Sequence, residues 1–534
     1  MTCLLPYWKI EVVRVSCPAM KIIHLRTLLI LVVSACSLTA TTEVTPPPTA
    51  TTVRFDPATI VPTVNRQLNV VPTLTLEPTT VTATPTDCQL TAGQPGTAYQ
   101  VKVNLNYAQR ALLAQQTVRY INRSNEALEY VVFNVEPNQW PGAFRLNEVT
   151  IDAQPAGYEL TGRKLRVNLP QVLEPGCAQE MLLAFQLNVP EIGQGLTAYR
   201  GFLGHSPRQL NLGNWLPMVA PHIDGEWVVR DAVLVGEQTV LDVADWDVTF
   251  NVSGAPDTLE IAGPGDVERI GERSWRFTLE ESRDFTVSLS DAFIITRDQT
   301  ESGVTVELYS FDDAQVETED RQTVDGAAHA LDTAVKSLTT FEALYGAYPY
   351  RRLAVVEGDF PDGMEFSGLV FVSKDWFTRF TGNPAAFLTV ITVHEVAHQW
   401  WYARVGNDQA QAPWLDEALA TYSEYVFIEE YYPDLRDWWW EWRVNNYSPQ
   451  GFVDSNVYQF SSIREYINTV YLLGARMLND VRTDLGTEAF FDLLHRYYEA
   501  GAGRIVSSDV FWAALSTDEL AATQQTRQRY LRDG

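Results

Sequence analysis

Hydrophobic and polar residues alternate along the chain between about residue 88 and residue 295. Apolar side chains take every second position in short runs, and Gly, Pro, Asn and Asp separate the runs. The clearest runs are 101–107, 164–169, 245–250, 275–279 and 285–289. A period of two is typical of strands that bury one face, and tight turns join such strands antiparallel. We therefore predict an N-terminal antiparallel β-sandwich or saddle domain over residues 88–297.

The period changes in the second half of the chain. After one further strand at residues 304–309, apolar residues recur at spacings of three and four from Val324 to Phe341, and Gly346 follows. This pattern predicts an amphipathic helix with a glycine stop. Short strands are expected at residues 353–356 and 369–372, and the remainder is rich in helical patterns. We predict a mainly helical domain over residues 298–534, so the fold class is multidomain α+β.

The first 36 residues resemble an export signal. Residues 20–36 contain a basic segment, a short apolar run and small residues that end at Cys36, which is the order found in signal peptides. The run is shorter than the ~20 apolar residues that a membrane span needs. Val33, Ser34, Ala35 and Cys36 resemble the lipobox of bacterial lipoproteins, in which the cysteine is acylated. We expect the true start at Met20, a lipid anchor on Cys36 and a place in the bacterial cell envelope outside the cytoplasm, with plain secretion as the alternative.

A linker and two cysteines follow the signal region. Residues 37–87 are rich in Thr and Pro, a composition that cannot bury a core and acts as a semi-extended tether. Of the five cysteines, Cys88 and Cys177 remain in the body of the protein. An even pair in an oxidising compartment suggests a disulfide, and two buried free thiols are the alternative.

The composition and the net charge of the chain exclude some classes of protein. Hydrophobic residues make up 46% of the chain and aromatic residues 11%, which is enough for a large core and excludes global disorder. The formal net charge of −28 repels nucleic acid and anionic membranes. It also attracts cations such as peptide amino termini weakly, although a charge that serves solubility explains it equally well. We expect no nucleic acid partner and find no sign of an obligate protein partner.

A metal-binding pattern lies between residues 391 and 402, where the chain reads His394-Glu395-Val-Ala-His398. On a helix the two histidines lie one turn apart on one face, so both rings can reach one ion, and Glu395 lies beside it. A catalytic zinc needs a third protein ligand. Glu417 follows His398 after eighteen residues, on a second predicted helix. We predict one Zn²⁺ held by His394, His398 and Glu417, with Glu395 as the general base that activates a zinc-bound water.

Alternative interpretations remain for the histidines and for some of the acidic residues. The alternative for the motif is a helix with two hydrogen-bonded surface histidines. His205 and His222 stand alone in the strand-rich half, where structural roles are expected. Glu424 lies two helical turns beyond Glu417 and is the candidate for orienting a metal ligand from behind.

The motif with its eighteen-residue spacing resembles the gluzincin aminopeptidases of the aminopeptidase N and leukotriene hydrolase family. Trp414-Leu-Asp-Glu417 looks like that family's Trp-Leu-Asn-Glu. Gly363-Met364-Glu365 is similar to its Gly-Ala-Met-Glu-Asn motif, and the resemblance implies substrate binding by Gly363 and Met364 and capture of the free α-amine by Glu365. It also implies a thermolysin-like catalytic domain and an oxyanion-stabilising phenol at Tyr471, with Tyr466 as its nearest rival.

Two departures from the family bear on specificity. Phe366 stands where the family has Asn, which we expect to add apolar surface beside the substrate and to favour apolar first residues. The chain also ends soon after the tyrosine segment, so we expect no large helical domain over the cleft. The resulting hypothesis is a zinc aminopeptidase that acts on peptides. The alternatives are an endopeptidase or oligopeptidase with an open cleft, and a non-catalytic binding protein on the same scaffold.

Overall fold

The structure is a computed structural model that describes Cys88, residues 96–317 and residues 321–532. The predicted signal region (residues 1–36, with Met20 and Cys36) and the linker (residues 37–87) lie outside the described residues. Within the described part of the chain, no helix combines the length and the apolar character that crossing a membrane requires.

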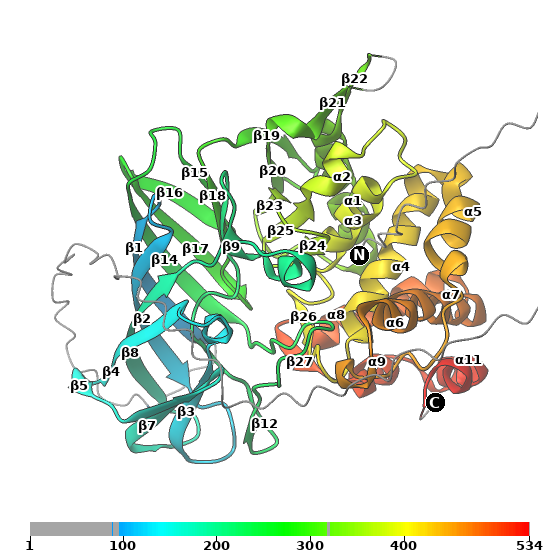
Figure 1. Ribbon diagram of the computed structural model, residues 1–534. Helices are drawn as coiled ribbons and strands as arrows, with labels where there is room; N and C mark the ends of the chain where they lie inside the picture. The colour runs from blue at the N-terminus through cyan, green and yellow to red at the C-terminus, as the bar shows by residue number, and fades with distance from the viewer. Residues whose placement is uncertain (1–87, 89–95, 318–320, 533–534) are drawn as a thin grey trace, which may run out of the picture. The chain divides into compact units, whose positions relative to one another are not determined.

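The first half of the described chain is built from strands (Figure 1). An eight-stranded sheet has the order β16 (Asp266–Gly271), β17 (Ser274–Ser282), β14 (Ala244–Ser253), β1 (Thr97–Asn106), β2 (Ala111–Ile121), β8 (Ala178–Asn188), β4 (Phe144–Ile151) and β5 (Gln154–Pro155). A four-stranded sheet contains β11 (Met218–Val219), β3 (Leu128–Asn134), β7 (Lys164–Leu173) and β6 (Tyr158–Thr161), and another contains β15 (Glu260–Ala262), β18 (Val287–Ser290), β10 (Leu210–Leu212) and β9 (Leu203–His205). A hairpin joins β12 (His222–Ile223) to β13 (Glu226–Trp227).

The alternating pattern of the sequence corresponds to burial in these strands. In β1, Val101, Val103 and Leu105 are buried while the residues between them are exposed or half-buried. In β14, Trp246, Val248 and Phe250 alternate in the same way. Each strand therefore gives one face to a common core, as the period of two predicts.

One pairing of the first domain departs from the antiparallel arrangement that the alternation predicts. β1 and β14 are parallel, with Thr97 opposite Ala244 and Asn106 opposite Ser253. Parallel neighbours need a long connection, and here the strands from β2 to β13 lie between the two in sequence. The alternation of apolar and polar residues within a strand shows which face of that strand is buried. It does not show whether a partner strand far away in the sequence runs parallel or antiparallel.

The second half begins with a mixed five-stranded sheet of order β19 (Ile294–Gln299), β20 (Thr305–Ser310), β23 (Arg352–Gly358), β25 (Leu369–Ser373) and β24 (Gly363–Met364). The predicted domain boundary at residue 297 falls inside β19, which pairs with β20. The parallel strands β20 and β23 are connected through α1 (Gly326–Tyr345), which begins at an Asp325 cap and ends at Gly346 with φ 132°. Two small sheets pair β21 (Gln315–Glu317) with β22 (Thr323–Asp325) and β26 (Val405–Asn407) with β27 (Arg504–Val506).

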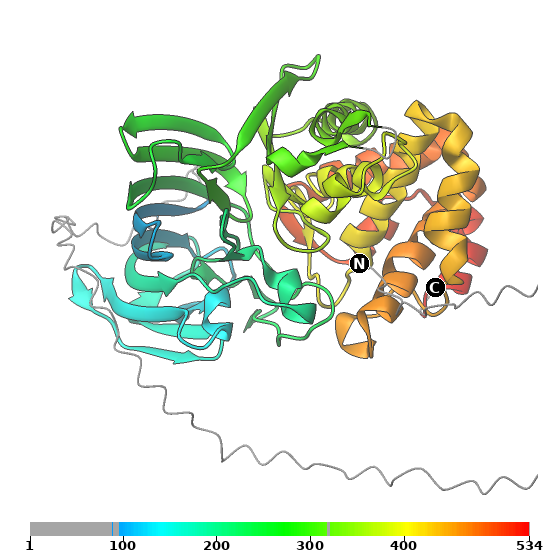
Figure 2. The same ribbon diagram turned by 45° about the horizontal axis from the view of Figure 1, so that its top comes forward.

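Helices make up the rest of this half and gather away from the strand-rich half (Figures 1 and 2). They are α2 (Lys374–Thr378), α3 (Phe387–Ala397), α4 (Trp414–Tyr431), α5 (Arg436–Trp438), α6 (Ile463–Tyr466), α7 (Leu473–Leu485), α8 (Thr487–Gly501), α9 (Ser508–Ala513), α10 (Thr517–Ala522) and α11 (Gln524–Tyr530). Two π-helical segments, η5 (Trp439–Val444) and η8 (Ile467–Leu472), continue α5 and α6.

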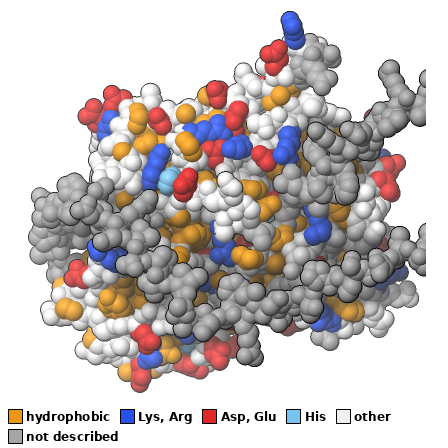
Figure 3. All heavy atoms as spheres, in the orientation of Figure 1, with side chains coloured by type: hydrophobic (Ala, Val, Ile, Leu, Met, Phe, Trp, Pro, Cys, Tyr) orange, Lys and Arg blue, Asp and Glu red, His pale blue; other side chains and the backbone are white. Residues whose placement is uncertain are grey.

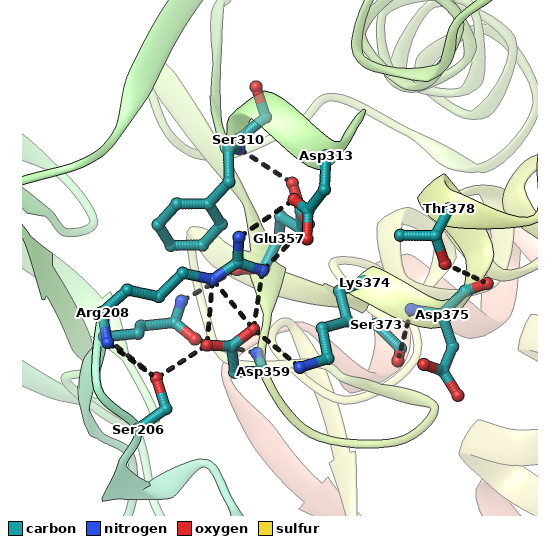
Figure 4. A network of polar contacts seen from close by, with 12 residues as sticks. Ser206, Arg208, Ser310, Asp313, Glu357, Asp359, Ser373, Lys374, Asp375 and Thr378 are labelled. Atoms are coloured by element: carbon teal, nitrogen blue, oxygen red, sulfur yellow. Dashed lines mark hydrogen bonds and ion pairs between the residues drawn. The ribbon is translucent and has the colours of Figure 1, made fainter. Parts of the chain in front are cut away.

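Arginines of the strand-rich half tie the two halves together. The buried Arg283 donates hydrogen bonds to the carbonyl oxygens of Tyr402, Arg404 and Arg504. Arg208 contacts Asp359 with its Nε and Nη2 atoms at 2.7 to 3.1 Å, and its guanidinium lies 3.7 Å from the centre of the Phe311 ring (Figure 4). These contacts hold the end of β23, from which the chain continues to Gly363, Met364 and Glu365.

Candidate metal centre and substrate cavity

The structure brings the three predicted metal ligands together. His394 lies in the last turn of α3, His398 directly follows that helix, and Glu417 lies in the first turn of α4. The Oε2 atom of Glu417 is 3.2 Å from Nε2 of His394 and 3.5 Å from Nε2 of His398. All three side chains are buried and their ligand atoms lie within 4.8 Å of one another.

These separations fit a tetrahedral zinc ion. Zinc binds imidazole nitrogen and carboxylate oxygen at about 2.0–2.2 Å, so two ligands of a tetrahedron lie roughly 3.3–3.5 Å apart. The site thus provides a His₂Glu set, and all three residues line the adjacent cavity. The donor set and its spacing suit zinc, and no fourth protein ligand is required for catalysis.

Hydrogen bonds fix the two imidazole rings from behind. The Nδ1 atom of His398 lies 2.9 Å from the carbonyl oxygen of Trp401, and Nδ1 of His394 lies 3.1 Å from Oε1 of Glu424. Both partners are acceptors, so each Nδ1 carries the proton and each Nε2 is left to bind metal. The structure therefore places Glu424 directly behind the imidazole ring of His394.

Both carboxylate oxygens of Glu424 also accept hydrogen bonds from other side chains. Arg443 donates to Oε1 and Oε2 at 2.8 and 2.9 Å, and the indole of Trp439 donates to Oε2 at 3.2 Å. Burial alone would raise the pKa of Glu424, but the facing arginine outweighs it and lowers that pKa. Glu424 is therefore an ionised acceptor for His394. The sequence offered no motif that singled out Arg443 or Trp439.

Glu395 lies in the cavity beside the ligands. The residue is 5% exposed, and burial raises the pKa of its carboxyl group to about 8, an effect that the two nearby histidines reduce. A carboxyl group in this range can accept a proton and return it near neutral pH. Gly363 lies directly against it, because a Cβ added at this glycine would overlap the Oε1 atom of Glu395. The predicted substrate-binding glycine thus also makes room for the predicted base.

The metal ligands and Glu395 line a cavity of about 170 Å³ that both halves of the chain contribute to. The predicted residues Glu365, Gly363 and Met364 line it as well. Glu365 is 5% exposed and accepts a hydrogen bond from Nε2 of Gln409 at 3.2 Å. Buried surroundings raise its pKa.

A second acid, Glu237, meets Glu365 in this cavity and was missed by sequence reasoning. Glu237, Glu365 and Glu417 offer carboxylate oxygens that lie within 4.8 Å of one another. Burial and the neighbouring Glu365 raise the pKa of Glu237 well above its usual range. Crowded carboxyl groups of this kind are stabilised by a cation between them. Glu237 comes from the strand-rich half, in a loop that follows Gly236 (φ 64°), and no local pattern marks it.

The segment that carries Glu365 is anchored on both sides of that residue. Gln399, next to His398, accepts a hydrogen bond from the Gly368 amide at 2.8 Å and donates one to the Phe366 carbonyl at 3.0 Å. The Ser367 amide lies 3.2 Å from both carboxylate oxygens of Asp284, which also accepts from the Tyr402 hydroxyl at 2.8 Å. The metal-binding motif and the Glu365 segment are therefore positioned by the same side chains.

Tyr471 and Tyr466 are the two candidates for the phenol that stabilises the oxyanion, and their surroundings differ. The Tyr471 side chain lines the cavity, and its ring lies parallel to that of His394 with centroids 5.7 Å apart. Tyr466 is 1% exposed, is not part of the cavity wall and directs its hydroxyl toward Gly236. Tyr471 is the better placed of the two to donate to a group bound at the metal.

The expectation that Phe366 adds apolar surface beside the substrate is wrong. Its side chain is fully buried in a cluster with Met364, Phe360 and Phe371, so it adds no apolar surface to the cavity. The residue reaches this core because β24 ends at Met364 and the chain turns away after Glu365. His205 and His222 lie in β9 and β12, and neither lines the cavity.

Comparison with known proteins agrees with this geometry. Residues 329–529 match the model of the Peptidase family M1 domain. Aminopeptidase N of Lactobacillus delbrueckii subsp. lactis is 28% identical over 237 residues, which cover 41% of this chain and 27% of that protein. The chain thus spans about a quarter of the length of the curated relatives it matches.

The fold is similar to that of the M1 zinc metallopeptidase from Deinococcus radiodurans, with a TM-score of 0.59 and 19% identity over 82% of this chain and 94% of that one. A mutant of that enzyme bound to a Tyr-Ser-Ala substrate has the same TM-score and identity, over 82% and 95% of the two chains. These likenesses confirm the predicted fold class, multidomain α+β with a β-rich first domain followed by a mainly helical second domain.

Proposed function

We propose that this protein, whose residues 329–529 form a domain of peptidase family M1, is a zinc-dependent aminopeptidase that removes the first residue from peptides. The observation that carries the proposal is the coincidence of two sites in one cavity. His394, His398 and Glu417 offer ligand atoms close enough to hold one zinc ion, and the acidic pair Glu237 and Glu365 lies next to Glu417. An acidic pair beside a metal ligand suits a protonated amino terminus one residue from the scissile bond.

The side chains of the cavity have separable roles in this reaction. Zinc, when bound, polarises the scissile carbonyl and makes water more acidic. Glu395 takes the proton of the attacking water and delivers it to the leaving amine. The Tyr471 hydroxyl donates to the oxygen on which negative charge develops. Glu365 and Glu237 hold the α-ammonium group, which fixes the register of the peptide.

The test compares free and blocked amino termini. The purified protein should contain about one zinc per chain and should hydrolyse an aminoacyl p-nitroanilide. N-acetylation should lower kcat/KM by at least about 10²-fold, because it leaves buried carboxylates without their cation. Glu365→Gln should reduce this preference. Equal turnover of free and acetylated substrates would favour an endopeptidase, and absence of zinc and turnover would favour a binding protein.

We also propose that the protein is anchored outside the cytoplasm through a lipid on Cys36. The support is the signal pattern of residues 20–36, the lipobox-like residues 33–36 and the Thr/Pro-rich tether behind them. The disulfide between Cys88 and Cys177 fits an oxidising compartment. Cys36→Ser should abolish labelling by a fatty-acid analogue and release the protein from the membrane fraction. Unchanged fractionation and labelling would argue against the anchor.

A further inference from the structure

One polar side chain in the cavity wall has no hydrogen-bond partner in the described part of the chain. Asn214 lines the cavity and is 7% exposed, and its buried Oδ1 atom accepts no hydrogen bond from any described residue. Among the described residues of the wall, it is the only one with a buried side-chain oxygen or nitrogen in this condition. A buried amide without a partner costs free energy, and native proteins keep few of them. The side chain therefore points to a ligand that completes its hydrogen bonds.

The backbone around Asn214 is held in place by its neighbours in sequence. The φ of Asn214 is 49°, in the left-handed region, where asparagine is one of the few residues tolerated besides glycine. A Cβ at the preceding Gly213 would overlap the ring of Phe366. The following Trp215 is fully buried, and its indole donates to the Phe285 carbonyl at 3.0 Å. The backbone position of Asn214 is thus fixed independently of a ligand.

Asn214 lies near the segment that carries the proposed amine anchor. Its neighbour Gly213 packs against the ring of Phe366, and Phe366 directly follows Glu365 in the chain. On the proposed function, the first residue of a peptide has its amine at Glu365 and its carbonyl at the metal. Its side chain starts between these two points, so the wall beside the Glu365 segment receives it.

The neighbours of Asn214 in this part of the wall are apolar. Phe202 and Met364 both line the cavity, and Phe202 packs against the buried cluster that contains Met364 and Phe366. The carbonyl of Phe202 accepts from the Gly213 amide at 2.7 Å, so its hydrogen bond is made within the protein. Asn214 adds a neutral polar group to these side chains. Binding sites take much of their specificity from a few polar groups in a mainly apolar wall.

The chemistry of the ligand follows from the amide group of Asn214. An amide donates through its nitrogen and accepts through its oxygen, and its natural complement is a second amide. We propose that Asn214 binds the side chain of the first substrate residue and selects asparagine or glutamine at that position. A hydrocarbon side chain of the same shape would leave both polar atoms of Asn214 unpaired. Sites built for a hydrogen bond reject such analogues strongly.

This inference rests on the proposed aminopeptidase activity, and one series of substrates separates the two. The series contains the p-nitroanilides of asparagine and leucine and those of glutamine and methionine, because the members of each pair are similar in size and differ in hydrogen bonding. kcat and KM are measured for the wild type, Asn214→Gly, Asn214→Asp and the control Asp224→Gly. Zinc content and Tm are recorded for each protein.

The variants separate the side chain from the backbone conformation. Glycine adopts the left-handed region without strain, so Asn214→Gly removes the amide and keeps the local fold. Aspartate also tolerates this region and keeps an acceptor, but an ionised carboxylate cannot donate. Asp224 has φ 50°, is exposed in the turn between β12 and β13, and lies outside the cavity wall, so Asp224→Gly is the matched control.

The wild type should hydrolyse the amide member of at least one pair with a kcat/KM about tenfold or more above that of its apolar partner, as two neutral hydrogen bonds provide. Asn214→Gly should bring this ratio to about one, mainly through a higher KM for the amide substrate, at unchanged zinc content. Asn214→Asp should also lower the ratio, because the donor is lost. Asp224→Gly should keep the wild-type ratio.

Two outcomes overturn the inference while the proposed activity stands. In one, the wild type hydrolyses the leucine and methionine substrates at least as well as their amide partners. In the other, the preference for the amide persists in Asn214→Gly, whether or not all rates fall together, and Asn214 then has a structural role only. Absence of turnover of all four substrates by the zinc-loaded wild type counts instead against the aminopeptidase itself.

Discussion

At the scale of single residues, the closest packing in the site is that of Gly363 against Glu395. Any side chain at position 363 would displace the carboxyl group that we propose as the base. Gly363→Ala should therefore lower kcat by at least about 10²-fold, the lower limit for loss of a general base. Zinc content should not change, because no metal ligand moves. Gly157→Ala, where a Cβ would meet only the end of the Asn168 side chain, is the control and should keep full activity.

Glu395 and Glu424 are both buried acids next to His394, and their amide variants should fail in different ways. Glu395→Gln should retain zinc and lose activity by about 10²–10⁴-fold, because an amide cannot take the proton. Glu424→Gln should weaken zinc binding by about 10–100-fold, because it removes the charge that orients the His394 ring. Competition with a zinc chelator and initial rates at saturating zinc distinguish the two. The same defect in both variants would contradict the separate roles.

How far single residues could be predicted depends on how local their contacts are. His394, Glu417 and Glu424 lie on two neighbouring helices and His398 directly follows the first of them, so local spacing brings their side chains to one region. Glu237 reaches Glu365 from a different half of the fold, over more than a hundred residues, and no spacing rule covers such a distance. Phe366 was misplaced for a related reason, since its direction depends on where β24 ends.

At the scale of elements, the end of β23 contains a buried acid, Glu357, inside the polar network of Figure 4. Its side chain is fully buried, and burial raises its pKa to about 8, although the Phe311 amide donates to it at 2.9 Å. The Arg208 contact at 3.5 Å is too long to reverse this effect. Glu357 is therefore protonated in the folded protein at pH values where the unfolded chain has released the proton.

The sign of the pH dependence follows from linkage. Between about pH 4.5 and pH 8 the folded state binds more protons than the unfolded state at this residue, so its contribution to stability falls as pH rises. Glu357→Gln is neutral throughout, and Oε1 of the amide can still accept from Phe311. The free energy of unfolding of the variant, measured by denaturant titration, should decline less than that of the wild type from pH 5 to pH 8, by up to about 3–4 kcal/mol. Glu129→Gln, an exposed carboxyl of β3, should reproduce the wild-type slope.

The elements themselves were largely predictable. Period-two runs and three–four spacing depend only on which side of a segment faces the core, and β1, β14, α1 and α4 appear where those patterns lie. The parallel pairing of β1 with β14 and the π-helical form of η8 could not be read in the same way. Both depend on partners elsewhere in the fold, which decide strand direction and stretch a helix locally.

At the scale of the whole molecule, the net charge and the length of the chain could be read from the sequence, but the contacts between its two halves could not. On the part of the face that Figure 3 leaves visible, acidic and basic side chains are interspersed, so the net charge of −28 is not gathered there in one patch. The charges that matter for the proposed chemistry are inside, where Glu237 of one half meets Glu365 of the other. The joint between the halves is therefore part of the site.

The disulfide is the longest-range covalent link in the described chain. It joins Cys88, ahead of β1, to Cys177, ahead of β8, across 89 positions of sequence. In the chain-entropy model a loop of this length destabilises the unfolded state by up to about 4–5 kcal/mol, and measured effects are commonly about 2–4 kcal/mol.

Cys88→Ser should therefore lower the Tm measured by calorimetry by several degrees, with zinc content and activity at 25 °C unchanged, because the metal ligands lie in the other half. Dithiothreitol should lower the wild-type Tm by a similar amount and leave that of the variant where it is. If reduction left the wild-type Tm unchanged, the bond would contribute nothing to stability, and the support it gives to an oxidising compartment would disappear with it.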